Sequence, residues 1–280
     1  MSGRWNHRMD LSFVFYFVFL GASVGFLAGL LGIGGGMVLV PFMSILFPLY
    51  GVPEEWVVHA AIATAMTTIV FTSISSVRAH QAKKAILWPI VAIMAPGIII
   101  GGFLSGGAVF SYLSGAGLSL FFALFVGYSG YRMLRSPALI PNRSMPTPVI
   151  SFGVGAGIGF LSGLVGAGGG FLSVPYMTRG NVAMPNAVAT SAALGFFIAV
   201  SNSVGYIYSG FGVVQDQPAM IGYIFWPALI VVSVVSVLTA PLGASYAHKL
   251  PVKTLRRVFG IMLFAIAAYM LYKSWQQAGL

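Results

Sequence analysis

The sequence has no cysteine and few charged residues. Of its 280 residues 6% are charged, and only four are acidic. Without cysteine the chain has no disulfide, thiolate-bound metal, iron–sulfur cluster or cysteine nucleophile. A soluble domain carries roughly 25% charged residues, so this chain has too little polar surface for a soluble fold.

Apolar residues account for 58% of the chain, and its mean hydropathy is +0.94. Because a membrane-spanning helix needs about 20 apolar residues, the length allows roughly eight to ten membrane segments and no soluble domain of useful size. We therefore predict an all-α, polytopic membrane protein.

An internal repeat organises the chain. Residues 25–43 read GFLAGLLGIGGGMVLVPFM, residues 159–177 read GFLSGLVGAGGGFLSVPYM, and twelve of these nineteen positions are identical. Such a repeat predicts two related structural units. Arg4 and Arg8 precede the first apolar run, as in a secretory signal peptide, but the run leads directly into the repeat and is interpreted as a membrane helix. Weaker matches follow each copy: Ala63-Thr64-Ala65 with Ala189-Thr190-Ser191, and Trp88-Pro89 with Trp226-Pro227.

Apolar runs divide the chain into long segments and two short ones. The long segments are expected at about residues 11–31, 56–77, 86–104, 109–134, 149–165, 187–208, 221–246 and 255–272, and the short ones at 37–50 and 171–177. Each short segment follows a triple glycine, and the sequence leaves open whether it crosses the bilayer or turns back. We expect a first membrane repeat at residues 1–134, a cytoplasmic linker at 135–148 and a second, inverted repeat at 149–280.

Charge placement predicts the orientation through the positive-inside rule. With the linker in the cytoplasm, all four acidic residues lie outside. Of the fourteen lysine and arginine residues, all lie inside except Arg4, Arg8 and Lys273. In the first half, the basic loop follows the second long segment. In the second half, it follows the third long segment. That switch is expected if the halves are inserted upside down relative to each other, which is a transporter architecture. Because the charges lie at segment ends, no nucleic-acid partner is expected.

Glycines recur before each triple glycine at helical spacing. Small residues four apart let helix backbones approach closely in lipid, so we interpret these glycine ridges as packing surfaces. Three consecutive glycines cost a helix interior about 1 kcal/mol each relative to alanine, which predicts a helix break. Prolines five residues later limit the helical piece that follows. The ridges are Gly21, Gly25 and Gly29 with Gly155, Gly159 and Gly163, and the prolines are Pro41 and Pro175.

A helix break inside a bilayer is tolerated where its free N–H and C=O groups meet protein, water or a ligand. The helix that starts after each break directs unpaired N–H groups, with partial positive charge, at the break, and glycine leaves them accessible. We predict an anion site there, near the membrane midplane. The alternative is a tight turn without a ligand. The glycines of this site are Gly34, Gly35, Gly36, Gly168, Gly169 and Gly170.

No acidic residue falls within an expected membrane segment. Proton relays and cation sites in membranes generally use intramembrane carboxylates, so a cation carrier of that kind is disfavoured. Hydroxyl and amide side chains hydrogen-bond sulfonate or carboxylate oxygens and are candidates to line the site, although each alone is also explained as an interhelical contact. They are Thr64, Thr67, Ser75, Asn186, Thr190, Ser191, Ser201 and Asn202.

Arg78 and His80 lie at the cytoplasmic end of the second long segment, and His59 lies near its outer end. We interpret the first two as orientation anchors or, alternatively, as guides or gates for an anion. His59 is of a type that titrates near neutral pH, and a structural role is the preferred interpretation.

One enzyme motif is present. Gly127-Tyr-Ser-Gly130 fits the Gly-x-Ser-Gly pattern of intramembrane serine proteases, which pair the serine with a histidine on another helix. The only later histidine, His248, falls in a loop, and Ser129 has no counterpart in the second half. A four-residue match in a glycine-rich chain is weak evidence for catalysis.

The paired Gly-x-Gly-Gly-Gly blocks, each followed by Val-Pro, resemble those of the sulfite exporter TauE/SafE family of membrane transporters. The resemblance covers most of the chain. It implies transport of small sulfur-containing or organic anions, such as sulfite, sulfoacetate or another sulfonate, and thiosulfate, across the bacterial cytoplasmic (inner) membrane. Carried over by position, it points to the triple glycines and adds Pro41 and Pro175 as substrate-binding positions.

We therefore predict a secondary transporter of a small anion that works by alternating access, with no catalytic residue, cofactor or metal. An ion gradient or the substrate's own gradient would drive it, and proton coupling would need a protonatable substrate or His59. The alternatives are a passive anion channel, a carrier of a non-sulfur substrate and, remotely, a serine protease. The anion, the direction of transport and the oligomeric state stay open.

Overall fold

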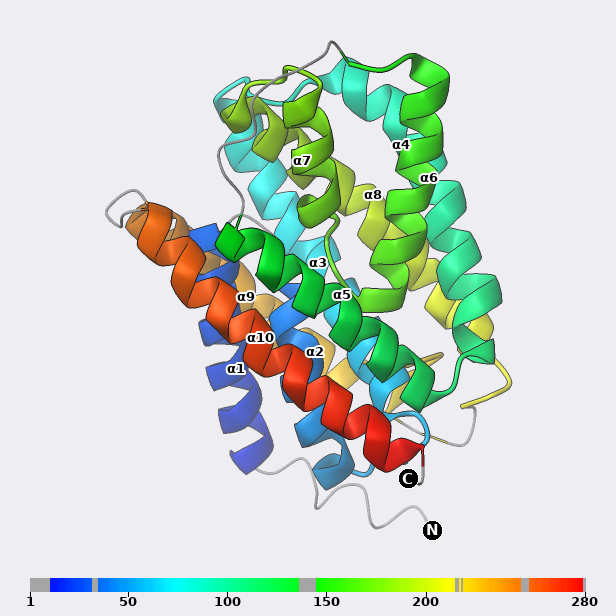
Figure 1. The fold of residues 1–280 in the computed structure, drawn as a ribbon. Helices are drawn as coiled ribbons and strands as arrows, with labels where there is room; N and C mark the ends of the chain where they lie inside the picture. Colours follow the sequence, from blue (N-terminus) through cyan, green and yellow to red (C-terminus); the bar gives the residue numbers. More distant parts are fainter. Residues whose placement is uncertain are drawn as a thin grey trace.

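The structure is a computed structural model that describes residues 11–31, 35–135, 145–214, 217, 219–247 and 252–278. Figure 1 shows long helices stacked side by side, with the shorter α2 and α7 among them. In chain order the elements are α1 (Leu11–Leu31), α2 (Gly36–Leu46), the 3-10 helix η1 (Phe47–Tyr50), α3 (Val57–Ala82), α4 (Trp88–Phe103), the π-helix η2 (Leu104–Val109), the 3-10 helix η3 (Phe110–Tyr112), α5 (Gly115–Arg135), α6 (Pro148–Val165), α7 (Gly170–Arg179), α8 (Met184–Gly210), β1 (Met220–Ile221), β2 (Ile224–Phe225), α9 (Trp226–Ala247) and α10 (Val252–Gln277).

Within the described residues, eight helices are long and apolar enough to cross a membrane. This confirms the all-α, polytopic class. The strands form one small antiparallel hairpin, in which Met220 pairs with Phe225 and Ile221 with Ile224. Sequence analysis did not predict this hairpin.

Three local predictions are wrong. The segment expected at 109–134 begins as a helix only at Gly115, because residues 104–112 continue α4 as a π turn and a 3-10 turn. The segment expected at 221–246 begins at Trp226, where Pro227 occupies the first helical turn and needs no intrahelical N–H bond. Pro41 and Pro175 do not end their helices, since α2 continues to Leu46 and α7 to Arg179.

Each short helix returns beside the helix before it. The ring centroids of Phe13 and Tyr50 are 4.8 Å apart, so the start of α1 lies next to the end of η1. In the second half, the hydroxyl oxygens of Ser151 in α6 and Tyr176 in α7 are 2.8 Å apart. The chain therefore forms two helical hairpins, α1–α2 and α6–α7.

The tips of the two hairpins meet inside the protein. A Cβ added to Gly36 would lie 2.1 Å from the carbonyl oxygen of Gly166 and 2.8 Å from Ile69 in the middle of α3. A Cβ on Gly169 would lie 2.3 Å from Ile198 in the middle of α8. If the hairpins crossed the membrane from opposite sides, their tips would lie about 30 Å apart. If the two halves are inserted in opposite directions, both short helices therefore turn back within the membrane.

The glycine ridges pack each hairpin against the other half of the chain. A Cβ on Gly25 of α1 would lie 2.6 Å from the backbone of Ser236 in α9, and one on Gly159 of α6 would lie 2.3 Å from the carbonyl oxygen of Ile98 in α4. The pairs α1·α9 and α4·α6 are each among the most extensive helix contacts. This exchange of equivalent contacts supports the division into two inverted repeats, whose boundaries stay a prediction.

Candidate functional site

Both helix breaks have the same local structure. Gly35 precedes α2 with φ 63° and ψ −16°, and Gly169 precedes α7 with φ 74° and ψ −10°. These left-handed dihedrals favour glycine, which has no Cβ. Each glycine carbonyl accepts two amide hydrogen bonds from the first turn of its helix, from Val38 and Leu39 in α2 and from Leu172 and Ser173 in α7.

The amides before those bonded ones have no hydrogen bond to the described residues. They are the N–H groups of Gly36 and Met37 in α2, and of Gly170 and Phe171 in α7. Free N–H groups at a helix start carry partial positive charge and bind anions. Gly168, just before the second tip, is only partly buried. Gly34 lies outside the described residues.

The described residues place no carboxylate near the tips. The acidic residues within the described part of the chain are Glu54 and Glu55, in the loop before α3. No group of three histidine or acidic side chains there is placed to hold a metal ion. The amide N–H groups at the tips therefore face no carboxylate within the described part of the chain, which suits an anion.

Thr64 and Thr190 hold helix ends across the two halves. The Thr64 hydroxyl oxygen accepts the N–H of Phe225, just before α9, at 3.0 Å. The Thr190 hydroxyl oxygen accepts the N–H of Leu87, just before α4, also at 3.0 Å. Their geometry gives both residues a structural role, which differs from the ligand role suggested by the sequence.

The other candidate hydroxyls have partners as well. The Thr67 hydroxyl oxygen is 2.9 Å from that of Ser203, and the Ser201 hydroxyl donates to the Phe197 carbonyl at 2.8 Å. The Ser191 hydroxyl oxygen is 2.7 Å from that of Ser173, which donates to the Gly169 carbonyl at 3.0 Å. Ser191 is thus the candidate that connects α8 directly to a helix break. Outside the tips, the Asn186 side-chain amide donates to the Ala85 carbonyl at 2.9 Å, and Ser75 is partly buried in α3.

Asn202 lies in a buried polar cluster beside the end of α6. Its side-chain amide donates to the carbonyls of Ile198 at 2.8 Å and Gly159 at 3.3 Å. Its Oδ1 has no hydrogen-bond partner among the described residues, and neither do the hydroxyl oxygens of Ser105 and Ser162. Sequence analysis missed both serines. Ser162 precedes the ridge glycine Gly163, but no sequence signal pointed to Ser105 in the π-helix.

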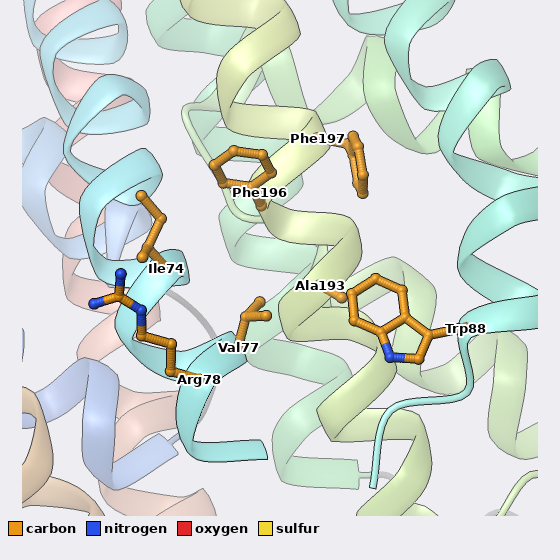
Figure 2. Close-up of a pocket in the computed structure, with 7 residues that line it drawn as sticks. All are labelled: Ile74, Val77, Arg78, Trp88, Ala193, Phe196 and Phe197. Atoms are coloured by element: carbon orange, nitrogen blue, oxygen red, sulfur yellow. The ribbon is translucent and has the colours of Figure 1, made fainter. Parts of the chain in front are cut away.

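A groove of about 320 Å³ lies between the C-terminal part of α3, the start of α4 and α8. Figure 2 shows Phe196, Phe197 and Ala193 of α8 on one side, with Ile74 and Val77 of α3 on the other, and Trp88 at one end. The exposed Arg78 guanidinium lies at the edge of the groove (Figure 2). His80 is partly buried one turn from the end of α3. The structure places neither at the tips.

His59 lies in a cluster of aromatic rings near the outer end of α3. Its ring centroid is 5.1 Å from those of Phe110 and Tyr223 and 5.5 Å from that of Trp56. Its Nε2 is 2.9 Å from the Leu113 carbonyl oxygen. Burial raises the pKa of the Tyr223 phenol from 10.0 to about 12, so this neighbour stays neutral. These contacts support the structural interpretation of His59.

The geometry offers no support for a protease. The Ser129 hydroxyl donates to the Phe125 carbonyl of its own helix at 2.8 Å and is 6% exposed. His248 lies outside the described residues.

Within the described residues, eight helices long and apolar enough to cross a membrane, together with two helical hairpins whose tips meet inside the protein, define a polytopic membrane transporter. Residues 17–270 match the sulfite exporter TauE/SafE family, and the chain belongs to that family. It is 35% identical to a probable membrane transporter protein of Haemophilus influenzae, over 94% of this chain and 99% of the relative. A probable membrane transporter protein of Methanocaldococcus jannaschii is 28% identical over 91% and 94% of the two chains, and one of Bacillus subtilis, YunE, is 27% identical over 94% and 98%. No solved structure matches the chain.

Proposed function

We propose that the protein is a secondary transporter of a small sulfur-containing or organic anion, such as sulfite, sulfoacetate or another sulfonate, or thiosulfate. It acts in the bacterial cytoplasmic membrane by alternating access. The observation that carries the proposal is the contact between the two helix breaks, where Gly36 at the start of α2 touches Gly166 at the end of α6. Each break is followed by a helix start whose first amides make no hydrogen bond to the described residues.

Anion selectivity follows from the groups present at the tips. The N–H groups of Gly36 and Gly170 are donors with partial positive charge, and no carboxylate in the described segments repels an anion from them. The anionic oxygens of a sulfonate or sulfite are strong acceptors for such groups. The family is named for sulfite export, which agrees with this chemistry.

The moving bodies combine elements of both halves. Because α1 packs on α9 and α6 packs on α4, each hairpin moves with a helix of the other half. We infer two bodies, α1–α2 with α9 and α6–α7 with α4, that change their contact at the tips. Outward opening would separate the tips toward one face and inward opening toward the other, so the anion at the tips is exposed to one side at a time.

Flux measurements on the purified protein in liposomes test this function. We expect saturable efflux of sulfite, sulfoacetate or thiosulfate, accelerated by the same anion outside because a carrier exchanges its substrate. Non-saturating flux without exchange would indicate a channel and overturn alternating access. Absence of flux with every sulfur anion would overturn the substrate class, and a wider anion panel would then identify a non-sulfur cargo.

Two alanine variants locate the transport path. Gly36→Ala places a Cβ 2.1 Å from the Gly166 carbonyl oxygen and is expected to reduce flux at least about tenfold by holding the tips apart. Gly157→Ala is the matched control, because a Cβ there has nothing within 4 Å. Equal flux in both variants would place the path away from the tips.

A further inference from the structure

Three buried oxygens near the second hairpin tip have no partner among the described residues: Oδ1 of Asn202 and the hydroxyls of Ser105 and Ser162. Their side chains are 0%, 0% and 1% exposed. Buried polar atoms are nearly always hydrogen-bonded, so each unpaired one indicates a missing water, ion or functional contact. Three unpaired oxygens near one hairpin tip therefore indicate that an ion or ligand binds there.

The oxygens of Asn202 and Ser105 converge on the last turns of α6. Both lie within 2.6 Å of the position that a Cβ on Gly163 would take, yet they form no hydrogen bond with each other. The orientation of the Asn202 amide is fixed, since its nitrogen already donates to the Ile198 and Gly159 carbonyls. Oδ1 therefore faces Ser105 as an acceptor that lacks a donor.

The backbone around this point is irregular on both sides. Ser105 lies in the π-helix η2, and such π segments occur frequently at functional sites. Gly163 lies in the last turn of α6, whose carbonyl end carries partial negative charge. The Tyr206 hydroxyl donates to the Gly163 carbonyl and closes the cluster on the side of α8.

We propose that this cluster is a Na⁺ site, formed by Asn202 Oδ1, the Ser105 hydroxyl and the carbonyl end of α6, with Ser162 beside it. All its free groups are oxygens, which suit a hard cation, and the end of α6 supplies partial negative charge. The lack of a carboxylate favours a monovalent ion, and the tight packing at Gly163 favours a small one. Half-helix ends and unwound carbonyls coordinate Na⁺ in other inverted-repeat transporters.

The site rests on the proposed function and gives it a coupling ion. The carbonyl end of α6 and the amide end of α7 flank the same break, so a cation at one end and an anion at the other stabilise each other. The first hairpin has no equivalent: Ala28 stands at the position of Ser162, and Ser76 at that of Asn202. One Na⁺ site per chain follows from this asymmetry.

Thermal unfolding without any substrate tests the site directly. At equal ionic strength, 100 mM NaCl is expected to raise the midpoint of thermal unfolding by about 3–5 °C over choline chloride. This shift applies if the Na⁺ concentration is about ten times the dissociation constant of the site. KCl is expected to give a smaller shift. Equal midpoints in all three salts would overturn the proposal and leave a buried water or a direct Ser105–Asn202 contact.

Two serine variants locate the effect. Ser105→Ala removes a hydroxyl without a partner and is expected to abolish the Na⁺ shift, with Ser162→Ala as the second variant if Ser105→Ala fails to fold. Ser233→Ala is the matched control, because Ser233 of α9 is also buried and its hydroxyl also has no partner among the described residues. A Na⁺ shift that survives in Ser105→Ala, or that disappears in Ser233→Ala, would overturn the assignment.

Flux in liposomes separates this site from the transport function. An inward Na⁺ gradient is expected to accelerate anion uptake at least tenfold over an equal choline gradient. Anion flux that ignores Na⁺, together with no thermal shift, would overturn the Na⁺ site and leave the transporter. A Na⁺-dependent thermal shift without flux of any anion would keep the site and overturn the proposed function.

Discussion

The hydroxyl oxygen of Thr64 in α3 accepts the backbone N–H of Phe225 at a distance of 3.0 Å. The bond repeats in the other half, where Thr190 of α8 accepts the N–H of Leu87. Phe225 and Leu87 each precede a Trp-Pro pair that starts a helix, α9 or α4. Each half therefore holds the start of a helix of the other half, and the two halves interlock.

Replacing either threonine by valine tests this interlock. Thr64 and Thr190 are fully buried, so valine keeps the volume but leaves a buried N–H unpaired, which costs about 1–3 kcal/mol of unfolding free energy. We expect Thr64→Val and Thr190→Val to lower the thermal midpoint in detergent by similar amounts. Thr72→Val is the control, because the Thr72 hydroxyl contacts only its own helix, at 3.3 Å or more. A loss in Thr72→Val equal to that in the other two would contradict the interlock.

The left-handed glycine at the second tip gives a further test. Alanine at Gly169 must adopt φ 74° and places a Cβ 2.3 Å from Ile198; the left-handed backbone alone costs about 1–2 kcal/mol. We expect Gly169→Ala to be destabilised by at least that amount in chemical unfolding. Gly157→Ala on the open face of α6 is expected to be neutral or slightly stabilising, because alanine favours a helix. Equal stability of the two variants would mean that the break adopts another backbone conformation.

The sequence predicted the helix breaks because consecutive glycines act locally, on the backbone of the residues that carry them. It predicted the packing role of Gly25 and Gly159 for the same reason, since ridge spacing is a property of one helix. What it left open was the partner of each surface. Whether α2 returns beside α1, and whether Thr64 faces a ligand or the start of α9, depends on contacts between segments far apart in the chain. Ser105 was missed because its surroundings come from another segment: the π turn around it packs closely against α8, where a Cβ on Gly106 would lie 2.8 Å from the Asn202 carbonyl oxygen.

Single cysteines test the inverted arrangement. The natural chain has no cysteine, so each introduced thiol is the only one. Leu49 at the end of the first hairpin is 63% exposed, and Met184 just after the second is 50% exposed. An impermeant maleimide is expected to label Leu49→Cys from outside intact cells and Met184→Cys only after permeabilisation. Labelling of both from the same side would indicate parallel repeats.

Lys273 breaks the positive-inside pattern, and the structure gives the reason. Its ammonium donates to the Ser44 carbonyl of α2 at 3.0 Å. In a regular helix that carbonyl would accept the N–H four residues later, but that residue is Pro48, which has none. The ammonium also lies 3.9 Å from the carboxylate of Glu54. Lys273 is thus retained at the outer end because it satisfies the last turn of α2, where a cation is also favoured by the helix dipole.

Two substitutions separate the contributions of these contacts. Lys273→Met keeps the side-chain length but leaves the buried Ser44 carbonyl unpaired, and we expect a loss of about 1–3 kcal/mol of unfolding free energy. Glu54→Gln removes only the ion pair, and because the Glu54 side chain is 69% exposed, we expect a loss below about 1 kcal/mol. Unfolding at low and high salt distinguishes them, since screening weakens the exposed pair and not the buried hydrogen bond. A larger loss in Glu54→Gln than in Lys273→Met would mean that the ion pair, rather than Ser44, holds α10 against the first hairpin.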